Sequence, residues 1–282
     1  MASASAHAPV TIDIVIAGVG GQGTVLASKL LAHAARGAGL PVRTAETIGM
    51  AQRGGSVLGH VRIGACESPL VPRSHATLLI GFEPAETVRA LPYLRSGGMV
   101  VTAIHPIEPV HATLRDASYD GSAELSYLRR MRADRDDANW LESDTQACID
   151  VSLRKTIGTL VEVDGNALCA ALGSPRVLNV VLLGAACEAL RHAQQTELAS
   201  VACNAASLET ALSELLKPQL VSLNVQALRL GAESVAAAAT AQASHRESGP
   251  AERDPAERAP AERDPVESAP AEAGSATMDA QE

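Results

Sequence analysis

The sequence predicts an α/β fold with three layers, in which an open and mostly parallel sheet lies between helices, followed by a disordered C-terminal tail. Short apolar runs rich in β-branched residues alternate with helical periodicities, as in layered α/β domains. A glycine-rich turn separates the first strand from the first helix, and the composition changes sharply near residue 244. The chain has 282 residues and is 46% hydrophobic but only 2% aromatic, so aliphatic residues must build the core.

The predicted elements follow one another in a regular order. Strands are predicted where Val, Ile and Leu form short runs. These runs lie at residues 12–18, 41–46, 56–64, 76–82, 97–104 and 155–165. Helices are predicted where apolar residues recur at helical spacing, after Gly23, near Pro84 and from Arg176. The first strand, the first helix and the second strand form a β-α-β unit.

We predict one domain at residues 11–243. Three segments lack the alternation of strands and helices, one within this domain and one on each side of it. Residues 1–10 predict a disordered N-terminus. Residues 111–147 are highly charged and predict a solvated helix and loops, which form a peripheral excursion. In residues 244–282 proline recurs every five residues, which rules out a continuous helix and leaves little apolar surface to bury. We therefore predict that this tail is disordered.

Charge and cysteine content exclude several classes of protein. The net charge is −9, of which the tail carries −6 (ten acidic and four basic residues), so a nucleic-acid binder that neutralises phosphates is excluded. Five scattered cysteines without a C-x-x-C pair indicate reduced thiols in a reducing compartment. The chain shows no secretory signal pattern and no apolar run long enough to span a bilayer. We expect a cytoplasmic protein without membrane or nucleic-acid partners.

The turn G-V-G-G-Q-G has the G-x-G-x-x-G spacing of a dinucleotide-binding loop in a Rossmann-like fold. The fingerprint positions hold Gly18, Gly20 and Gly23, and the variable positions next to them hold Gly21 and Gln22. Glu46, at the end of the second predicted strand, lies where a ribose-binding acid is expected. A stand-alone nucleotide-binding module is therefore one candidate function.

A second glycine-rich loop follows Glu46, which a nucleotide-binding fold does not need. Its central residues are Gln52, Arg53, Gly54, Gly55 and Ser56. Because both loops follow strands at the carboxyl edge of the sheet, we expect them to lie side by side. An arginine beside paired glycines suits a bidentate contact with a phosphate or carboxylate. The alternative is that Arg53 pairs with a carboxylate of this chain and the glycines only turn the backbone.

Together, GVGGQGTVLASKLL and AETIGMAQRGGSVLGHVRIG resemble the gamma-type component of the 2-oxoacid:ferredoxin oxidoreductases. The resemblance extends from Ile12 to Glu233 without the charged excursion, and the pair of loops is far more specific than the first loop alone. It implies oxidative decarboxylation of a 2-oxoacid, transfer of the acyl group to coenzyme A and reduction of ferredoxin. The motif IGMAQRGGSV favours the indolepyruvate group of this family. Pyruvate, 2-oxoglutarate and branched-chain oxoacids stay as alternative substrates.

The resemblance also implies thiamine diphosphate, Mg²⁺ and [4Fe-4S] clusters, and it implies that a large alpha subunit carries them. This chain has no closely spaced cysteines for a cluster. Its string VDGNAL, from Val163 to Leu168, lacks the first glycine of the G-D-G…N motif that holds thiamine diphosphate in this family. We expect the isolated chain to bind no cofactor or metal, to contain no catalytic residue and to be inactive.

The resemblance implies that the two loops face the partner subunit, and that their backbone N–H groups and Arg53 could also contact the phosphates of coenzyme A. The loop residues in question are Gly18, Gly20, Gly21, Gln22, Gly23, Gln52, Arg53, Gly54, Gly55 and Ser56. We expect two residues near them to be structural. His60 is predicted to be a satisfied structural histidine, and Asn179 is predicted to hydrogen-bond a neighbouring loop.

Overall fold

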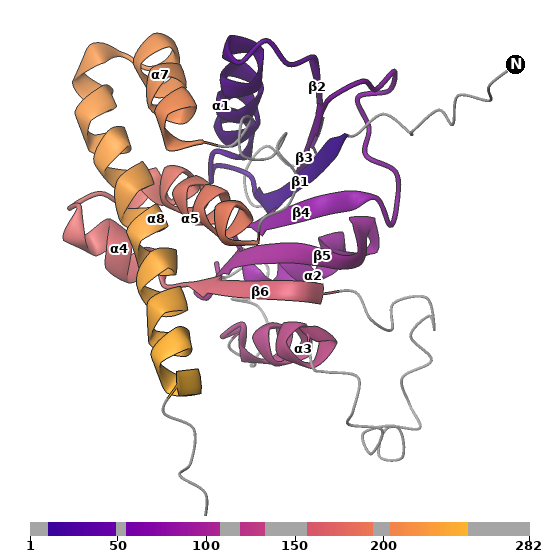
Figure 1. Ribbon diagram of the computed structural model, residues 1–282, viewed down its shortest axis with the longest axis vertical. Coiled ribbons are helices and arrows are strands. Elements are labelled where there is room, and N and C mark those ends of the chain that lie inside the picture. Colours follow the sequence, from indigo (N-terminus) through magenta and orange to yellow (C-terminus); the bar gives the residue numbers. More distant parts are fainter. Residues whose placement is uncertain (1–10, 49–54, 108–118, 133–156, 194–203, 248–282) are drawn as a thin grey trace, which may run out of the picture. The chain divides into compact units, whose positions relative to one another are not determined.

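The computed structural model describes residues 11–48, 55–107, 119–132, 157–193 and 204–247 (Figure 1). The chain divides into two units, Met1–Gln242 and Ala243–Glu282. The strands are β1 (Ile12–Val19), β2 (Val42–Ile48), β3 (Ser56–Ile63), β4 (Ala76–Gly81), β5 (Leu94–Ala103) and β6 (Ile157–Val163). The α-helices are α1 (Thr24–Gly37), α2 (Pro84–Ala90), α3 (Ser122–Arg132), α4 (Gly165–Ala171), α5 (Leu178–His192), α7 (Ala205–Leu215) and α8 (Pro218–Glu247). In the described residues, no helix combines the length and apolar character needed to cross a bilayer.

The six strands form one sheet in the order β2-β3-β1-β4-β5-β6. β1, β4, β5 and β6 are joined by parallel pairing, whereas β3 runs antiparallel to both of its neighbours, β1 and β2. The predicted α/β fold with a mostly parallel sheet is confirmed. The predicted β-α-β unit is also present, because β1 and β2 run in the same direction. Its two strands are not neighbours, however, since β3 lies between them.

Helices cover both faces of the sheet and complete the three predicted layers. Side chains alternate between the faces along β1: Ile14 and Ile16 lie in one core, Val15 and Ala17 in the other. The first core contains residues of α1, α5, α7 and α8, and the second contains residues of α2 and α3. In Figure 1, α7 lies beside α1, and α8 crosses α5.

The charged segment at 111–147 contributes a helix to one of these layers. Leu125 and Leu128 of α3 are buried in the second core, three residues apart on one helical face. On the exposed side, Arg129 binds the carboxylate of Glu162 on β6 through Nε at 2.9 Å and Nη2 at 3.1 Å. The predicted helix is therefore present with a largely exposed, charged side, and its two leucines pack it on the sheet. The rest of this segment, including Trp140, lies outside the described residues.

The last helix, α8, continues to Glu247, three residues beyond the predicted start of the tail at residue 244. Alanine-rich sequence has the highest helix propensity, which accounts for the later end. Residues 1–10 and 248–282 lie outside the described residues, so their disorder stays a prediction.

The connection between β3 and β4 packs on the sheet face that carries the second core, where Val71 is buried. His60 is 2% exposed, and its Nδ1 accepts a hydrogen bond from the Val71 N–H at 3.3 Å. The imidazole ring contacts Tyr93 edge to face, with ring centroids 5.4 Å apart. Burial lowers the pKa of His60, so the neutral ring is the form that fits this site. The prediction of a structural histidine is confirmed.

A nearly buried ion pair holds the same connection two residues farther along β3. Arg62 Nε donates to Asp13 Oδ1 at 2.8 Å, and Nη2 donates to Oδ2 at 3.2 Å. These two residues are directly paired across β1 and β3. The remaining Arg62 Nη1 donates to the carbonyls of Ser68 and Leu70, so one guanidinium joins two strands and the segment over them.

Two glycines allow α5 and α8 to pack at backbone contact. A Cβ added to Gly184 would lie 2.0 Å from the Leu228 carbonyl oxygen, and a Cβ added to Gly231 would lie 1.9 Å from the Val181 carbonyl oxygen. Since neither neighbour is a flexible side chain, a larger residue must push the helices apart.

We predict that Gly184→Ala lowers the free energy of unfolding by about 1–3 kcal/mol, the usual range for overpacking a core. Alanine is the better helix former, so a loss of stability can only come from the contact with Leu228. Gly37→Ala is the matched control, because a Cβ at this position in α1 would meet no atom within 4 Å. Urea denaturation of both variants tests the packing, and equal stabilities would contradict it.

We also predict a pH dependence that originates at His60. Its folded-state pKa is lowered, so the stability it contributes is complete above the unfolded value of about 6.5 and is lost as the pH falls below that value. Wild-type stability should therefore fall more steeply between pH 7 and pH 5 than that of His60→Gln, which has no titrating ring. Parallel slopes in the two denaturation series would exclude His60 as the source.

Candidate functional site at the carboxyl edge of the sheet

The first glycine-rich loop is held by its own glutamine. Gln22 Oε1 accepts a hydrogen bond from the Val19 N–H at 2.6 Å, and Gln22 Nε2 donates to the Phe82 carbonyl at 2.8 Å. Val19 ends β1 and Phe82 directly follows β4, so the carboxamide spans the ends of two neighbouring parallel strands. This is the position at which an open α/β sheet offers a crevice to ligands.

Three of the four glycines of the loop have a structural reason in this arrangement. Gly18 leaves room for Gln22, because an added Cβ would lie 2.9 Å from its Oε1 and 3.1 Å from the Phe82 Cβ. Gly21 and Gly23 have φ values of +103° and +84°, which favour glycine. Gly23 is the N-cap of α1, and no side chain caps this helix.

Asn179, at the start of α5, hydrogen-bonds the end of the first loop at Gly23. It is 3% exposed, its Nδ2 donates to the Gly23 carbonyl at 3.3 Å, and its Oδ1 accepts from the Val180 N–H. A Cβ on Gly23 would lie only 2.5 Å from Asn179 Nδ2. The prediction that Asn179 hydrogen-bonds a neighbouring loop is confirmed.

The second loop joins the first through its backbone. β2 and β3 form an antiparallel hairpin, and the loop between them is the predicted second glycine-rich loop. Its end lies beside the end of β1, because Val19 pairs with Ser56 and the Gly20 N–H donates to the Gly55 carbonyl at 2.8 Å. Gln52, Arg53 and Gly54 lie outside the described residues. Both predicted roles of Arg53 therefore stay predictions.

The geometry disfavours the dinucleotide interpretation of the first loop. The N–H groups of Val19 and Gly20 already donate to Gln22 and Gly55 and are not directed at a pyrophosphate. In a dinucleotide fold the acid that binds the ribose ends a strand adjacent to the first. Here Glu46 lies on β2, two strand spacings or about 10 Å from β1, because β3 intervenes.

The sequence interpretation missed two polar pairs farther along the same edge. Glu83 follows β4, is 2% exposed and accepts hydrogen bonds from the Tyr119 hydroxyl and the Glu86 N–H. Burial, and after it the carboxylate of Glu83, raise the pKa of Tyr119. Farther along, His105 Nε2 lies 2.8 Å from Asp164 Oδ1. No local motif marks these pairs, because each joins residues that are far apart in the sequence.

The VDGNAL string does not fit a site for Mg²⁺ and a diphosphate. Asp164 is the N-cap of α4, where its carboxylate accepts the Ala167 N–H at 2.9 Å. This hydrogen bond, and after it the contact with His105, lower the pKa of Asp164. Asp164 Oδ1 thus serves both the helix and the histidine. Across the described parts of the chain, no group of three His, Cys, Asp or Glu side chains could hold a metal ion.

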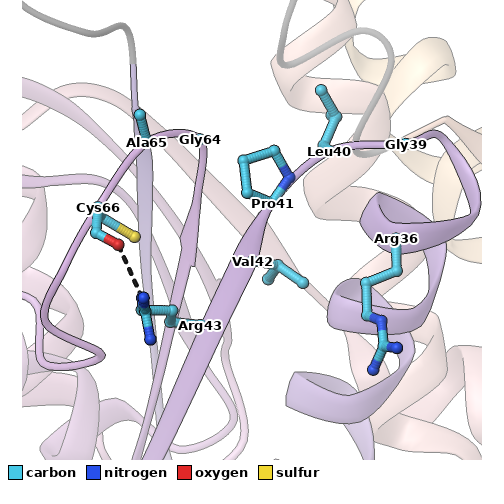
Figure 2. A pocket seen from close by; sticks show the side chains of 9 residues that line it. All are labelled: Arg36, Gly39, Leu40, Pro41, Val42, Arg43, Gly64, Ala65 and Cys66. Atoms are coloured by element: carbon cyan, nitrogen blue, oxygen red, sulfur yellow. Dashed lines mark hydrogen bonds between the residues drawn. The ribbon is translucent and has the colours of Figure 1, made fainter.

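A shallow pocket of about 800 Å³ lies at the opposite edge of the sheet, between the turn after α1 and the end of β3 (Figure 2). Arg43 Nε donates to the Cys66 carbonyl at 2.7 Å. Figure 2 shows Val42 between Arg43 and Arg36, so the two guanidinium groups do not converge on one ligand position. None of the described residues of the two loops lines this pocket.

The contact between Gly23 and Asn179 can be tested by a double-mutant cycle. We predict that Gly23→Ala costs roughly 2 kcal/mol or more in the wild type, from the left-handed backbone and the contact with the amide. In an Asn179→Ala background the same change should cost about 1 kcal/mol less, because the opposing amide is gone. Urea denaturation measures both costs, and purely additive effects would contradict the contact.

Comparison with known proteins agrees with the motifs and the fold. The family model described as pyruvate ferredoxin/flavodoxin oxidoreductase matches residues 13–234. The indolepyruvate oxidoreductase subunit IorB of Archaeoglobus fulgidus is 34% identical over 220 residues, which are 78% of this chain and 93% of that protein. The subunit of the same name from Pyrococcus horikoshii is 31% identical over the same shares of both chains.

Solved structures support the fold alone, because their identities are low. The gamma subunit of a keto/oxoacid ferredoxin oxidoreductase from Geobacter sulfurreducens has a TM-score of 0.52 and 19% identity, over 81% of this chain and 98% of that chain. A 2-oxoglutarate:ferredoxin oxidoreductase from Magnetococcus marinus also gives 0.52, at 18% identity, over 80% of this chain but only 31% of its own. With a family match that covers most of its length, the chain belongs to the pyruvate ferredoxin/flavodoxin oxidoreductase family.

Proposed function

We propose that this chain is the subunit of an indolepyruvate ferredoxin oxidoreductase that carries no cofactor of its own. The observation that carries the proposal is the pair of glycine-rich loops joined at Gly20 and Gly55, in a chain that matches 93% of the length of subunits bearing that name. A large alpha subunit carries thiamine diphosphate, Mg²⁺ and [4Fe-4S] clusters. The complex converts a 2-oxoacid and coenzyme A to an acyl-CoA and reduces ferredoxin.

The role assigned to this chain is to complete the partner's active site with the two-loop surface. We define this surface as residues 18–23 and 52–56. Glycines allow the backbone of a partner or of coenzyme A to approach closely, because no Cβ intervenes. Arg53 supplies a bidentate donor for a carboxylate or a phosphate.

The choice of indolepyruvate over other 2-oxoacids rests on the relatives. The proteins at 31–34% identity bear the indolepyruvate name, whereas those named for 2-oxoglutarate or an unspecified oxoacid are 18–19% identical. Co-expression with the large subunit, followed by an assay of viologen reduction that depends on coenzyme A, tests the assignment. Indolepyruvate should give the highest kcat/KM among aryl, branched-chain and short oxoacids. Full activity of the large subunit without this chain would overturn the proposal.

We predict that Arg53→Ala lowers turnover of the complex about 10- to 100-fold, which corresponds to the loss of one charge-assisted hydrogen bond. The isolated variant should keep the circular dichroism spectrum and melting temperature of the wild type. Arg36→Ala is the matched control, since Arg36 is an exposed arginine beside the pocket at the opposite edge of the sheet. Turnover equal to wild type in both Arg53→Ala and Gly54→Val would mean that the second loop is only a connector.

A further inference from the structure

Gln22 forms hydrogen bonds with both the N–H and the carbonyl of Val19. Its side-chain Oε1 accepts the Val19 N–H at 2.6 Å, and its own N–H donates to the Val19 carbonyl at 3.1 Å. The orientation of the carboxamide is unambiguous, because the Val19 N–H can only donate and the Phe82 carbonyl can only accept. One residue thereby fixes the φ and ψ angles of Val19 and anchors it to the end of β4.

The fixed orientation of Val19 determines where the next N–H points. The Val19 carbonyl and the Gly20 N–H belong to one planar peptide group, so fixing the carbonyl also directs the N–H. That N–H donates at 2.8 Å to the carbonyl of Gly55. Gly55 belongs to the second loop and directly precedes β3. Gly20 and Gly55 lack side chains that could hold this contact. The hydrogen bond continues the pairing of Val19 with Ser56, and its direction follows from the peptide plane that the Gln22 N–H holds.

The same carboxamide reaches the other side of the carboxyl edge. Phe82, its second partner, precedes Glu83, which receives the Tyr119 hydroxyl. Gln22 thus links the first loop to the end of β4, one residue before the glutamate that binds Tyr119. It is partly buried at this junction, and Gly18 provides the space for it.

We propose that Gln22 is the positioning residue of the two-loop surface. Its carboxamide joins the ends of β1 and β4 and holds the Val19 N–H, while its backbone N–H holds the Val19 carbonyl and so orients the peptide between Val19 and Gly20. The Gly20–Gly55 hydrogen bond then connects this peptide to the end of the second loop. The consequence for the partner subunit rests on the proposed function, whereas the coupling of the loops belongs to this chain alone. Gln22 acts through the backbone of the loops and touches no reacting atom.

The coupling is tested in the full-length chain by amide hydrogen exchange, measured by NMR. Gln22→Met keeps the length of the side chain and removes both hydrogen-bonding atoms. The Val19 and Gly20 amides should each exchange at least about tenfold faster, as expected for local opening, while Val15 in the middle of β1 keeps its protection. Unchanged exchange at Gly20 would overturn the coupling even if Val19 exchanged faster.

Two further variants separate positioning from general destabilisation. Gln22→Glu keeps the acceptor for Val19 but cannot donate to Phe82, so its increase in exchange should be smaller than that of Gln22→Met at both amides. Gln226→Met is the control, because this exposed glutamine of α8 hydrogen-bonds only Ser222 among the described residues. It should leave Val19 and Gly20 unchanged. Equal effects of Gln22→Glu and Gln22→Met would overturn the assigned role of the Val19 contact.

The consequence for the partner is measured as the affinity for the large subunit. Gln22→Met should weaken assembly about tenfold, and turnover should return when the partner is supplied in excess, since the residue positions the surface and does no chemistry. Equal affinity of the variant and the wild type would overturn the positioning role. If the wild-type chain itself fails to assemble, the proposed function fails, and the exchange experiment on the free chain still decides whether Gln22 couples the loops.

Discussion

The antiparallel pairing of β3 with β1 is the constraint on which the carboxyl edge of this protein depends. In a doubly wound sheet the second strand runs parallel to the first and lies next to it. Here β3 occupies that place and runs in the opposite direction, so it begins at the edge where β1 ends. The loop before β3 is thereby brought against the loop after β1. The contact between Gly20 and Gly55 extends this pairing by one further hydrogen bond.

This inserted strand also explains why a familiar glycine spacing serves a different purpose. The turn from strand to helix still needs residues that tolerate positive φ, as at Gly21 and Gly23. What differs is the destination of the backbone donors, because Gln22 and Gly55 accept the N–H groups of Val19 and Gly20. Buried polar groups are normally satisfied once, so donors used within the fold do not serve a ligand as well. The backbone donors of the first loop therefore hold the two loops together within this chain.

Small residues perform a similar task in the body of the protein. With few aromatic side chains to fill space, layers come together by direct backbone approach, as between α5 and α8 at Gly184 and Gly231. The same principle applies where α5 supports the first loop, since Gly23 leaves room for Asn179. Such contacts are sensitive to single substitutions, because a backbone cannot move aside as a flexible side chain can. The close packing of α5 thus connects the core to the loop that it supports.

Much of the fold and part of the site could be predicted from the sequence. Periodicity located the strands and the main helices because burial of one face imposes a repeat on the residues themselves. The paired motifs identified the family, and in the first loop the motif also reflects local backbone requirements, as the positive φ values of Gly21 and Gly23 show. The helix at Ser122–Arg132 was judged from its charge, and only its packing shows that Leu125 and Leu128 belong to the core. Charge on an exposed face hides a short apolar stripe from composition.

What the sequence by itself determined is local: the strand-turn-helix geometry, the aliphatic core and the two glycine-rich loops. The tertiary structure alone decided which groups these loops contact. Gln22 and Phe82 are 60 residues apart, and Asn179 and Gly23 are 156 residues apart. Such contacts depend on the strand order and on the direction of β3, which no local periodicity encodes. Since a hydrogen bond requires its partners within about 3 Å, its assignment follows from the assembled sheet and not from the order of residues along the chain.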